Sequence, residues 1–153
     1  MPFFSRRPTR IPDYDYSTPN YYFITICTHQ KRCIFGKAGA LNPFGKIALE
    51  SFSDIEKRFS HIRIVNKIVM PNHIHGIISI GESDPKISLD RVIGLYKSGV
   101  SRKIHELEPE LQVWQRSFHD HVIRDQQEYE QIWSYVQHNA QKWKQDCFYV
   151  EES

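Results

Sequence analysis

The sequence has few cysteines and no long apolar run. Cys27, Cys33 and Cys147 are odd in number and lack C-x-x-C spacing, so they indicate neither a disulfide framework nor a zinc knuckle. No stretch approaches the roughly 18 apolar residues of a membrane span. The first residues, MPFFSRRPTRIP, contain no apolar stretch long enough for a signal peptide. We therefore expect a cytoplasmic protein with reduced thiols and no membrane partner.

Positive and negative charges nearly balance, so the sequence has no large excess of either sign. The 153 residues contain 20 Lys+Arg and 18 Asp+Glu, which leaves a formal charge of +2. So small a surplus does not by itself indicate nucleic-acid binding, and only the placement of the basic residues can. Hydrophobic residues make up 40% and charged residues 25%, which excludes a disordered chain and is typical of one globular domain.

Residues 1–18 are predicted to form a basic, flexible arm ahead of a single domain over residues 19–153. Prolines interrupt the arm and deny it regular structure. Its basic residues, which precede any acidic one, are Arg6, Arg7 and Arg10. Such an arm is either a disordered tail or a segment that grips phosphates.

The hydrophobic pattern predicts an α+β domain. In chain order we expect a strand over 20–28, a helix over 42–60, strands over 62–70 and 73–80, a helix from 88 that Pro109 stops, a strand over 113–124 and a helix over 125–144. The first six elements follow the β-α-β-β-α-β order of a ferredoxin-like, four-stranded antiparallel sheet with packed helices. The third helix is additional to that plan.

Two histidines on the third predicted strand are candidate metal ligands. His73 and His75 are two residues apart, so both imidazoles project from the same side of the strand. Two neutral imidazoles at that spacing chelate divalent cations. A second pair, His119 and His121, lies among polar and basic residues, where exposed or phosphate-facing histidines need no metal.

The last helix offers a candidate nucleophile. At 100° per residue, its predicted buried stripe consists of Tyr129, Ile132, Trp133 and Val136. Tyr135 falls about 110° from the centre of that stripe, and Asn139 follows one turn later on the same edge. The alternative is a boundary tyrosine whose hydroxyl simply faces water.

These residues together suggest a chemistry. His73, His75 and the amide oxygen of Asn139 would form a neutral site with open positions, suited to Mg²⁺ or Mn²⁺ holding a phosphate. A tyrosine hydroxyl in line with that phosphate would attack phosphorus and form a covalent phosphotyrosine.

The combination resembles the HUH superfamily of single-tyrosine transposases and, within it, the REP-associated tyrosine transposases of the IS200-like group. The resemblance covers nearly the whole chain. It is carried by YDYSTPNYYFITICTHQKRCIFG, MPNHIHGII, YKSGVSRKIHE and VWQRSFHDHVIRDQQEYEQIWSYVQHNAQKW. A strand H-x-H combined with Tyr-x-x-x-Asn on a helix after a VWQR strand is more specific than either motif alone.

The resemblance implies that Tyr135 is the nucleophile, that His73 and His75 bind the metal, and that Asn139 is the third ligand. It implies cleavage and rejoining of single-stranded DNA at a short hairpin, through a 5′-phosphotyrosine, by a nucleoid-associated enzyme that works alone or as a homodimer. The group typically has Asn-Pro here, whereas this chain has Asn139-Ala140. Alanine would let the helix continue toward Trp143.

DNA contacts would fall to basic residues on several elements. The candidate DNA-binding residues are Arg6, Arg7, Arg10, Lys97, Arg102, Lys103, Arg116, His121 and Arg124. Unstacked bases could stack on Tyr14, Tyr16 or Trp114.

Two other functions stay open. A metal-dependent phosphodiesterase would hydrolyse nucleic acid or nucleotides without a covalent intermediate and would tolerate Tyr135→Phe. A non-catalytic nucleic-acid-binding module would need aromatic pairs typical of RNA-recognition signatures on its sheet face, and the sequence shows none.

Overall fold

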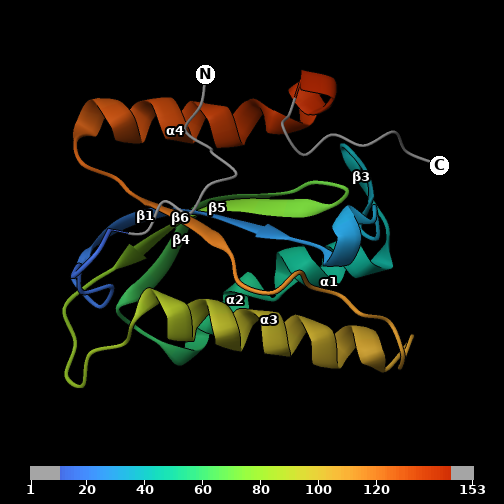
Figure 1. The fold of residues 1–153 in the computed structure, drawn as a ribbon, viewed down its shortest axis with the longest axis horizontal. Helices are drawn as coiled ribbons and strands as arrows, with labels where there is room; N and C mark the ends of the chain where they lie inside the picture. The colour runs from blue at the N-terminus through green and yellow to red at the C-terminus, as the bar shows by residue number, and fades with distance from the viewer. Residues whose placement is uncertain (1–10, 146–153) are drawn as a thin grey trace.

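A four-stranded antiparallel sheet lies between two helical layers in the computed structural model, which describes residues 11–145 (Figure 1). The strands are β1 (Asn20–Cys27), β4 (Ile62–Val69), β5 (His73–Ile80) and β6 (His119–Val122). Their order, β4-β5-β1-β6 with antiparallel neighbours, confirms the predicted ferredoxin-like arrangement.

The helices divide between the two faces of the sheet. On one face lie α1 (Pro43–Glu50), α2 (Phe52–Arg58) and α3 (Leu89–His105), and on the other lies α4 (Gln126–His138) (Figure 1). The short elements are η1 (His29–Lys31), β2 (Gly36–Lys37), β3 (Ala40–Leu41) and η2 (Asn139–Gln145). No helix among residues 11–145 is long and apolar enough to cross a membrane.

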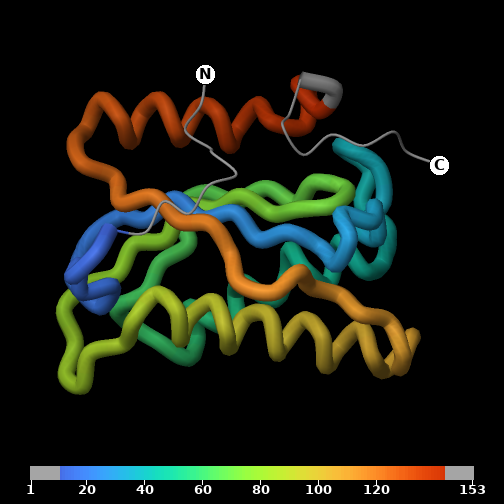
Figure 2. Tube along the Cα trace, in the orientation of Figure 1, coloured from blue at the N-terminus to red at the C-terminus, as the bar shows by residue number. Residues whose placement is uncertain are grey.

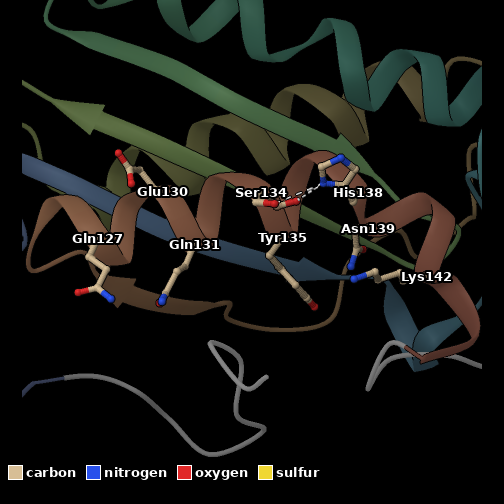
Figure 3. A pocket seen from close by; sticks show the side chains of 8 residues that line it. All are labelled: Gln127, Glu130, Gln131, Ser134, Tyr135, His138, Asn139 and Lys142. Atoms are coloured by element: carbon tan, nitrogen blue, oxygen red, sulfur yellow. Dashed lines mark hydrogen bonds between the residues drawn. The ribbon is translucent and has the colours of Figure 1, made fainter.

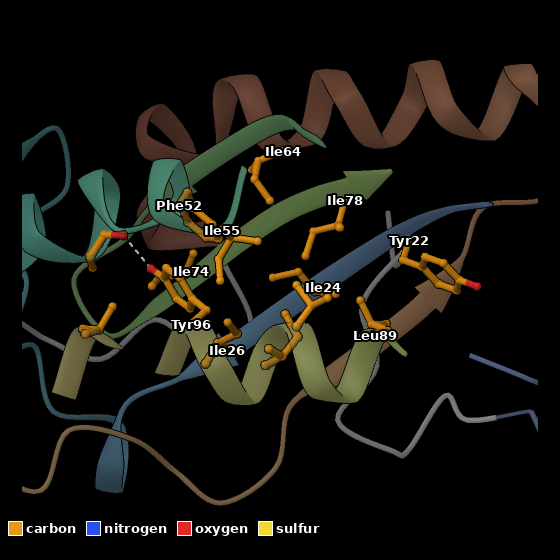
Figure 4. Packing of buried hydrophobic residues seen from close by; sticks show 14 of the residues in the cluster. Tyr22, Ile24, Ile26, Phe52, Ile55, Ile64, Ile74, Ile78, Leu89 and Tyr96 are labelled. Carbon is orange, nitrogen blue, oxygen red and sulfur yellow. Dashed lines mark hydrogen bonds between the residues drawn. The ribbon is translucent and has the colours of Figure 1, made fainter. Parts of the chain in front are cut away.

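The main hydrophobic core fills the space between the sheet and α1 to α3 (Figure 4). Ile24 and Ile78 face it from β1 and β5 because alternate residues of a strand point to the same side. Phe52 and Tyr96 stack with ring centroids 4.1 Å apart. The Tyr96 hydroxyl donates to the Ala48 carbonyl at 2.6 Å, which ties α3 to the end of α1.

A smaller core lies under α4. Phe23 and Ile77 from the sheet pack against Ile132 and Val136 of the helix. The predicted stripe is wrong at Trp133, which is 38% exposed because the buried face of α4 turns instead toward Glu128. That rotation brings Tyr135 closer to the sheet, where it packs against this core.

The predicted helix over 42–60 is broken in two at Ser51. Its start is as expected, because the Asn42 side chain accepts from the backbone N–H of Gly45 at 2.9 Å. The Ser51 hydroxyl donates to the Ile47 carbonyl at 2.7 Å, and Ser53 donates to the Glu50 carbonyl at 2.8 Å. Such back-bonding by serine competes with the backbone and bends helices.

The predicted strand over 113–124 is regular only within β6. An unbroken antiparallel register would pair Thr28 with Arg116, whereas the isolated bridge joins Thr28 to Trp114. Ser117 between these pairings has a φ of 70°, in the left-handed region. The extra residues bulge out of the strand on the connection from α3 to β6 that Figure 2 traces.

Part of the predicted arm packs on the domain, and residues 1–10 lie outside the described residues. Tyr16 is buried, and its carbonyl accepts from the backbone N–H of Leu89 at 2.9 Å. Tyr14 shares a hydrogen bond of 3.0 Å with Tyr22. Trp114 donates to the Lys97 carbonyl at 2.9 Å, so these three aromatic rings serve packing rather than an open stacking surface.

The last helix does not continue as an α-helix beyond His138. Residues Asn139–Gln145 form the tighter 3₁₀ helix η2, so the expectation that Ala140 lets the α-helix continue toward Trp143 is wrong. Lys142 departs from helical geometry at φ −114° and ψ 27°. The change of helix type therefore falls at Asn139, one turn after Tyr135.

Tyr96→Phe should lower the free energy of unfolding by about 1–2 kcal/mol, because the buried Ala48 carbonyl loses its donor. Urea denaturation followed by circular dichroism measures this change. Tyr21→Phe is the control, since the Tyr21 ring is exposed and the change should stay within about 0.5 kcal/mol. Equal effects of the two substitutions would contradict the role of the Tyr96 hydrogen bond.

Candidate active site at the histidine pair

The first three residues of β5 bring two imidazoles together beneath α4. His73 and His75 project from the same face of the sheet, and both side chains are fully buried. Their ring centroids are 4.6 Å apart and their Nε2 atoms are 3.1 Å apart. Phe23 stacks on His75 from β1 at 5.3 Å, so one side of the pair is apolar.

A hydrogen bond at Nδ1 orients each of the two imidazole rings. Asn72 Oδ1 lies 2.8 Å from His73 Nδ1, while Asn72 Nδ2 donates to the Lys31 carbonyl at 3.2 Å. Because an amide oxygen only accepts, His73 carries its proton on Nδ1 and presents the lone pair of Nε2. Thr25 Oγ1 lies 2.9 Å from His75 Nδ1 and orients that ring from the neighbouring strand.

The spacing of the two Nε2 atoms fits a divalent cation. Ligand atoms at right angles and about 2.1 Å from a cation lie about 3.0 Å apart, close to the 3.1 Å between His73 and His75. At this separation the two nitrogens can share either a proton, as a hydrogen bond, or a divalent cation. Among residues 11–145 no group of three His, Cys, Asp or Glu surrounds a metal position, so further ligands would be amide, water or substrate oxygens.

The last helix covers the pair with three side chains at four-residue steps. The Tyr135 ring lies 5.3 Å from the His75 ring, and the Trp143 ring lies 5.9 Å from the His73 ring. Asn139 stands between them in sequence and is 2% exposed. Its Oδ1 atom is buried and has no hydrogen-bond partner among the described residues. A buried amide oxygen is costly without a partner, so Asn139 is suited to a ligand role.

A cavity of about 550 Å³ opens along the outer edge of α4 beside the tyrosine. Figure 3 shows Tyr135, Asn139 and Lys142 extending to the same side of the helix. The remaining lining residues are Gln127, Glu130, Gln131, Ser134 and His138. His138 Nδ1 lies 2.9 Å from the Ser134 carbonyl, which ties that imidazole to its own helix. The cavity thus joins a phenol, an ammonium group and carboxamides.

A buried carboxylate fixes the start of α4 to β6. Glu128 Oε2 lies 3.0 Å from both Arg124 Nη2 and His121 Nε2, and its Oε1 accepts from the Arg124 backbone N–H at 2.8 Å. Burial alone would raise the pKa of Glu128, but the hydrogen bonds from Arg124 and His121 outweigh it and lower that pKa to about 2. Asp125 caps the same turn by accepting from the Glu128 N–H at 2.8 Å.

The comparisons with known proteins decide the family. The sequence model of the family described as "Transposase IS200 like" matches residues 17–139. The chain belongs to this family of IS200-like transposases. The matched segment contains the histidine pair, Tyr135 and Asn139, so the site described above lies within the family's own region.

Three relatives extend the match. An uncharacterised protein of Haemophilus influenzae is 34% identical over 169 residues, covering 95% of this chain and 94% of that protein. A REP-associated tyrosine transposase bound to a REP hairpin has a similar structure, with a TM-score of 0.63, 16% identity and coverage of 88% of this chain and 73% of its own. A transposase candidate from Deinococcus radiodurans R1 gives a TM-score of 0.55 at 16% identity, covering 84% and 95%. The two solved structures therefore share the fold of this IS200-like transposase.

The predicted DNA-binding residues of this transposase are spread over both faces of the sheet. Arg6, Arg7 and Arg10 lie outside the described residues. Lys97, Arg102 and Lys103 lie on α3, across the sheet from Tyr135 (Figure 1). The remaining three are Arg116, His121 and Arg124. Arg116 is exposed and precedes β6 in the chain, and His121 and Arg124 both contact Glu128.

Two of the lysines on α3 already have protein partners. Lys97 Nζ donates to the carbonyls of Gln115 and Ser117, each at 2.9 Å, and burial lowers its pKa. Lys103 pairs with Asp54 at 2.6 Å. These contacts give both lysines a structural role, and contact with DNA stays a prediction for them.

Several residues of the site were missed in the sequence. Thr25 orients His75 from a position fifty residues earlier, and only the register of β1 on β5 reveals it. Lys142 and Gln131 line the cavity with Tyr135. Their spacing from the tyrosine, seven residues after and four before, places them on its helix edge and could have identified them.

Glu128→Gln should flatten the acid dependence of stability. A carboxylate whose pKa is lowered in the folded state stabilises the fold above its unfolded pKa of about 4.3 and loses that effect as the pH falls toward 2. The melting temperature of the wild type should therefore fall more steeply between about pH 5 and pH 2 than that of the variant. Glu130→Gln, on the exposed side of α4, is the control. Parallel profiles for wild type and Glu128→Gln would contradict the assignment.

Proposed function

We propose that this transposase is a metal-dependent endonuclease and strand transferase that cleaves single-stranded DNA at hairpins through a covalent 5′-phosphotyrosine. One observation carries the proposal. The Tyr135 ring lies 5.3 Å from His75, whose Nε2 lies 3.1 Å from that of His73. The buried, unpartnered amide oxygen of Asn139 follows one helical turn after Tyr135, which supports its role as a further ligand.

The chain's own groups supply the nucleophile and its orientation. The Tyr135 oxygen forms a bond to phosphorus while the bond from phosphorus to the 3′-oxygen breaks. The phenol proton passes to solvent, and the departing 3′-oxygen takes up a proton to become a hydroxyl. Reversal of these steps with a different 3′-hydroxyl rejoins a strand without ATP. Phe23 contacts both Tyr135, at 6.1 Å, and His75, so it limits the motion of the phenol ring.

The histidine pair and Asn139 would hold the cation. A bound Mg²⁺ or Mn²⁺ supplies Lewis-acid polarisation of the scissile phosphate. Asn72 and Thr25 keep the two rings in the orientation that presents Nε2. Lys142 extends into the same cavity as Tyr135 and is placed to attract the negative phosphate (Figure 3).

The proposed substrate is hairpin DNA with a flanking single strand. The REP-associated relative was solved with a REP hairpin, which supports this choice. The cavity along α4 offers carboxamides at Gln127 and Gln131 for bases that leave a duplex. Because Tyr135 and the histidines come from the same chain, we propose that a single copy contains a complete site and needs no helix from a partner.

Tyr135→Phe should abolish formation of a denaturant-resistant protein–DNA band with labelled hairpin DNA and Mg²⁺, because phenylalanine has no oxygen to attack phosphorus. DNA binding measured by gel shift should stay within about twofold of wild type. Trp133→Phe, at an exposed position of the same helix, is the control and should still form the band. Cleavage by Tyr135→Phe without any band would instead indicate a hydrolytic phosphodiesterase.

Removal of either imidazole should weaken cation binding. His73→Ala and His75→Ala should each reduce Mn²⁺ affinity at least about tenfold in electron paramagnetic resonance titrations, and Asn139→Asp should increase it because a carboxylate replaces a neutral oxygen. His105→Ala, at the far end of α3, should bind Mn²⁺ as the wild type does. Undiminished binding by both histidine variants would contradict the proposed site.

A further inference from the structure

A second cavity, of about 340 Å³, lies where α4 begins. Its lining residues are Asn20, Tyr21, Ile123, Arg124, Asp125, Gln126 and Tyr129. Tyr129 lies six residues before Tyr135, about 120° away around the helix. The cavity is therefore separate from the one beside the tyrosine nucleophile. Its volume is at the lower end of the range of small-molecule sites, about 300–1,000 Å³, and suits a ligand of nucleotide size.

An aromatic pair forms one wall of this cavity. Tyr21 and Tyr129 meet edge to face with centroids 5.2 Å apart, and Tyr21 remains 43% exposed. Tyr21 is on the α4 side of the sheet, in one row with Ser79 of β5 and Arg63 of β4. Isolated exposed aromatic residues are common on protein surfaces, but a pair that lines a cavity beside cations is not explained by packing.

Charge near the pair complements a nucleic-acid strand. The Arg124 side chain is 76% exposed while it contacts Glu128, so its guanidinium can also reach a phosphate. Arg63 is exposed at the β4 end of the row. The Asp125 carboxylate also lines the cavity and is an acceptor of the kind that pairs with base amino groups. Aromatic faces beside cations are the usual features of single-strand binding sites.

We propose that this cavity binds one unpaired nucleotide of the DNA substrate, with its base against Tyr21 and Tyr129 and its phosphate at Arg124. This inference takes single-stranded DNA from the proposed function and does not depend on the phosphotyrosine step. Six residues of helix span about 9 Å along its axis. A stacked strand covers that length with two to three nucleotides at about 3.4 Å each. The bound base therefore lies at least two nucleotides from the scissile phosphate.

The test uses (dT)12 and (dA)12 in EDTA, where no metal-dependent cleavage takes place. Tyr21→Ser should weaken binding of at least one of these oligonucleotides about 5- to 100-fold in fluorescence anisotropy, because a stacked base is lost. Tyr21→Phe keeps the ring and should bind within about twofold of wild type. Arg124→Ala should weaken binding and reduce its salt dependence by about one phosphate, whereas Arg91→Ala, exposed on α3, should do neither.

Crosslinking locates the base directly. A (dT)12 with one central 5-iododeoxyuridine, irradiated in the complex, should attach to the peptide that contains Tyr21 or Tyr129. Wild-type affinity in Tyr21→Ser for both oligonucleotides, crosslinks confined to other segments, or no binding of either oligonucleotide would overturn the proposal. Its failure is distinguishable from failure of the proposed chemistry, because adduct formation at Tyr135 is measured separately with Mg²⁺. Equal loss in Tyr21→Phe and Tyr21→Ser would also overturn it, since stacking would then not be the cause.

Discussion

The burial of two imidazoles whose Nε2 atoms lie 3.1 Å apart is the constraint on which the site depends. Asn72 and Thr25 contact the Nδ1 atoms of His73 and His75, so the two Nε2 atoms are held facing each other. In a dry interior such a pair of polar nitrogens needs a shared proton or a cation between them. The covering helix places the Tyr135 ring 5.3 Å from His75, and the buried Asn139 follows one turn later along the chain.

Much of this site is local in sequence and could be predicted from it. The two-residue period of a strand puts His73 and His75 on one face, and the helical period puts Tyr135 and Asn139 on one edge. Neither period says that the strand and the helix meet. That juxtaposition follows from the chain's path across the sheet, and at the sequence level it came only from the resemblance to a family. The partner Thr25 depends on the register of β1 on β5 and had no local signal, whereas Trp143 continues the four-residue steps of Tyr135 and Asn139.

The errors of sequence reasoning have a common physical origin in competing hydrogen bonds. Ser51 divides one predicted helix because its hydroxyl bonds the preceding turn. The predicted last strand shortens to β6 while Lys97 holds the carbonyls of Gln115 and Ser117 outside the ladder. At Trp133 the error concerns burial, since Glu128 takes the inward position through its contacts with Arg124 and His121. In each case the hydrogen bonds or ion pairs of a polar side chain, which the hydrophobic pattern does not include, decide where the element ends or which face is buried.

The layer that carries Tyr135 rests on a smaller core than the rest of the domain. The core between the sheet and α1 to α3 is extensive, whereas α4 rests on a small cluster around Phe23 and Ile132 and on the contacts of Glu128. Elements with little buried apolar surface open at a lower free energy than the whole fold. Tyr135, the proposed nucleophile, is therefore on the layer with the smaller buried core, while the histidines are fixed in β5. Under the proposed function, DNA reaches the buried histidine pair only if the covering helix moves.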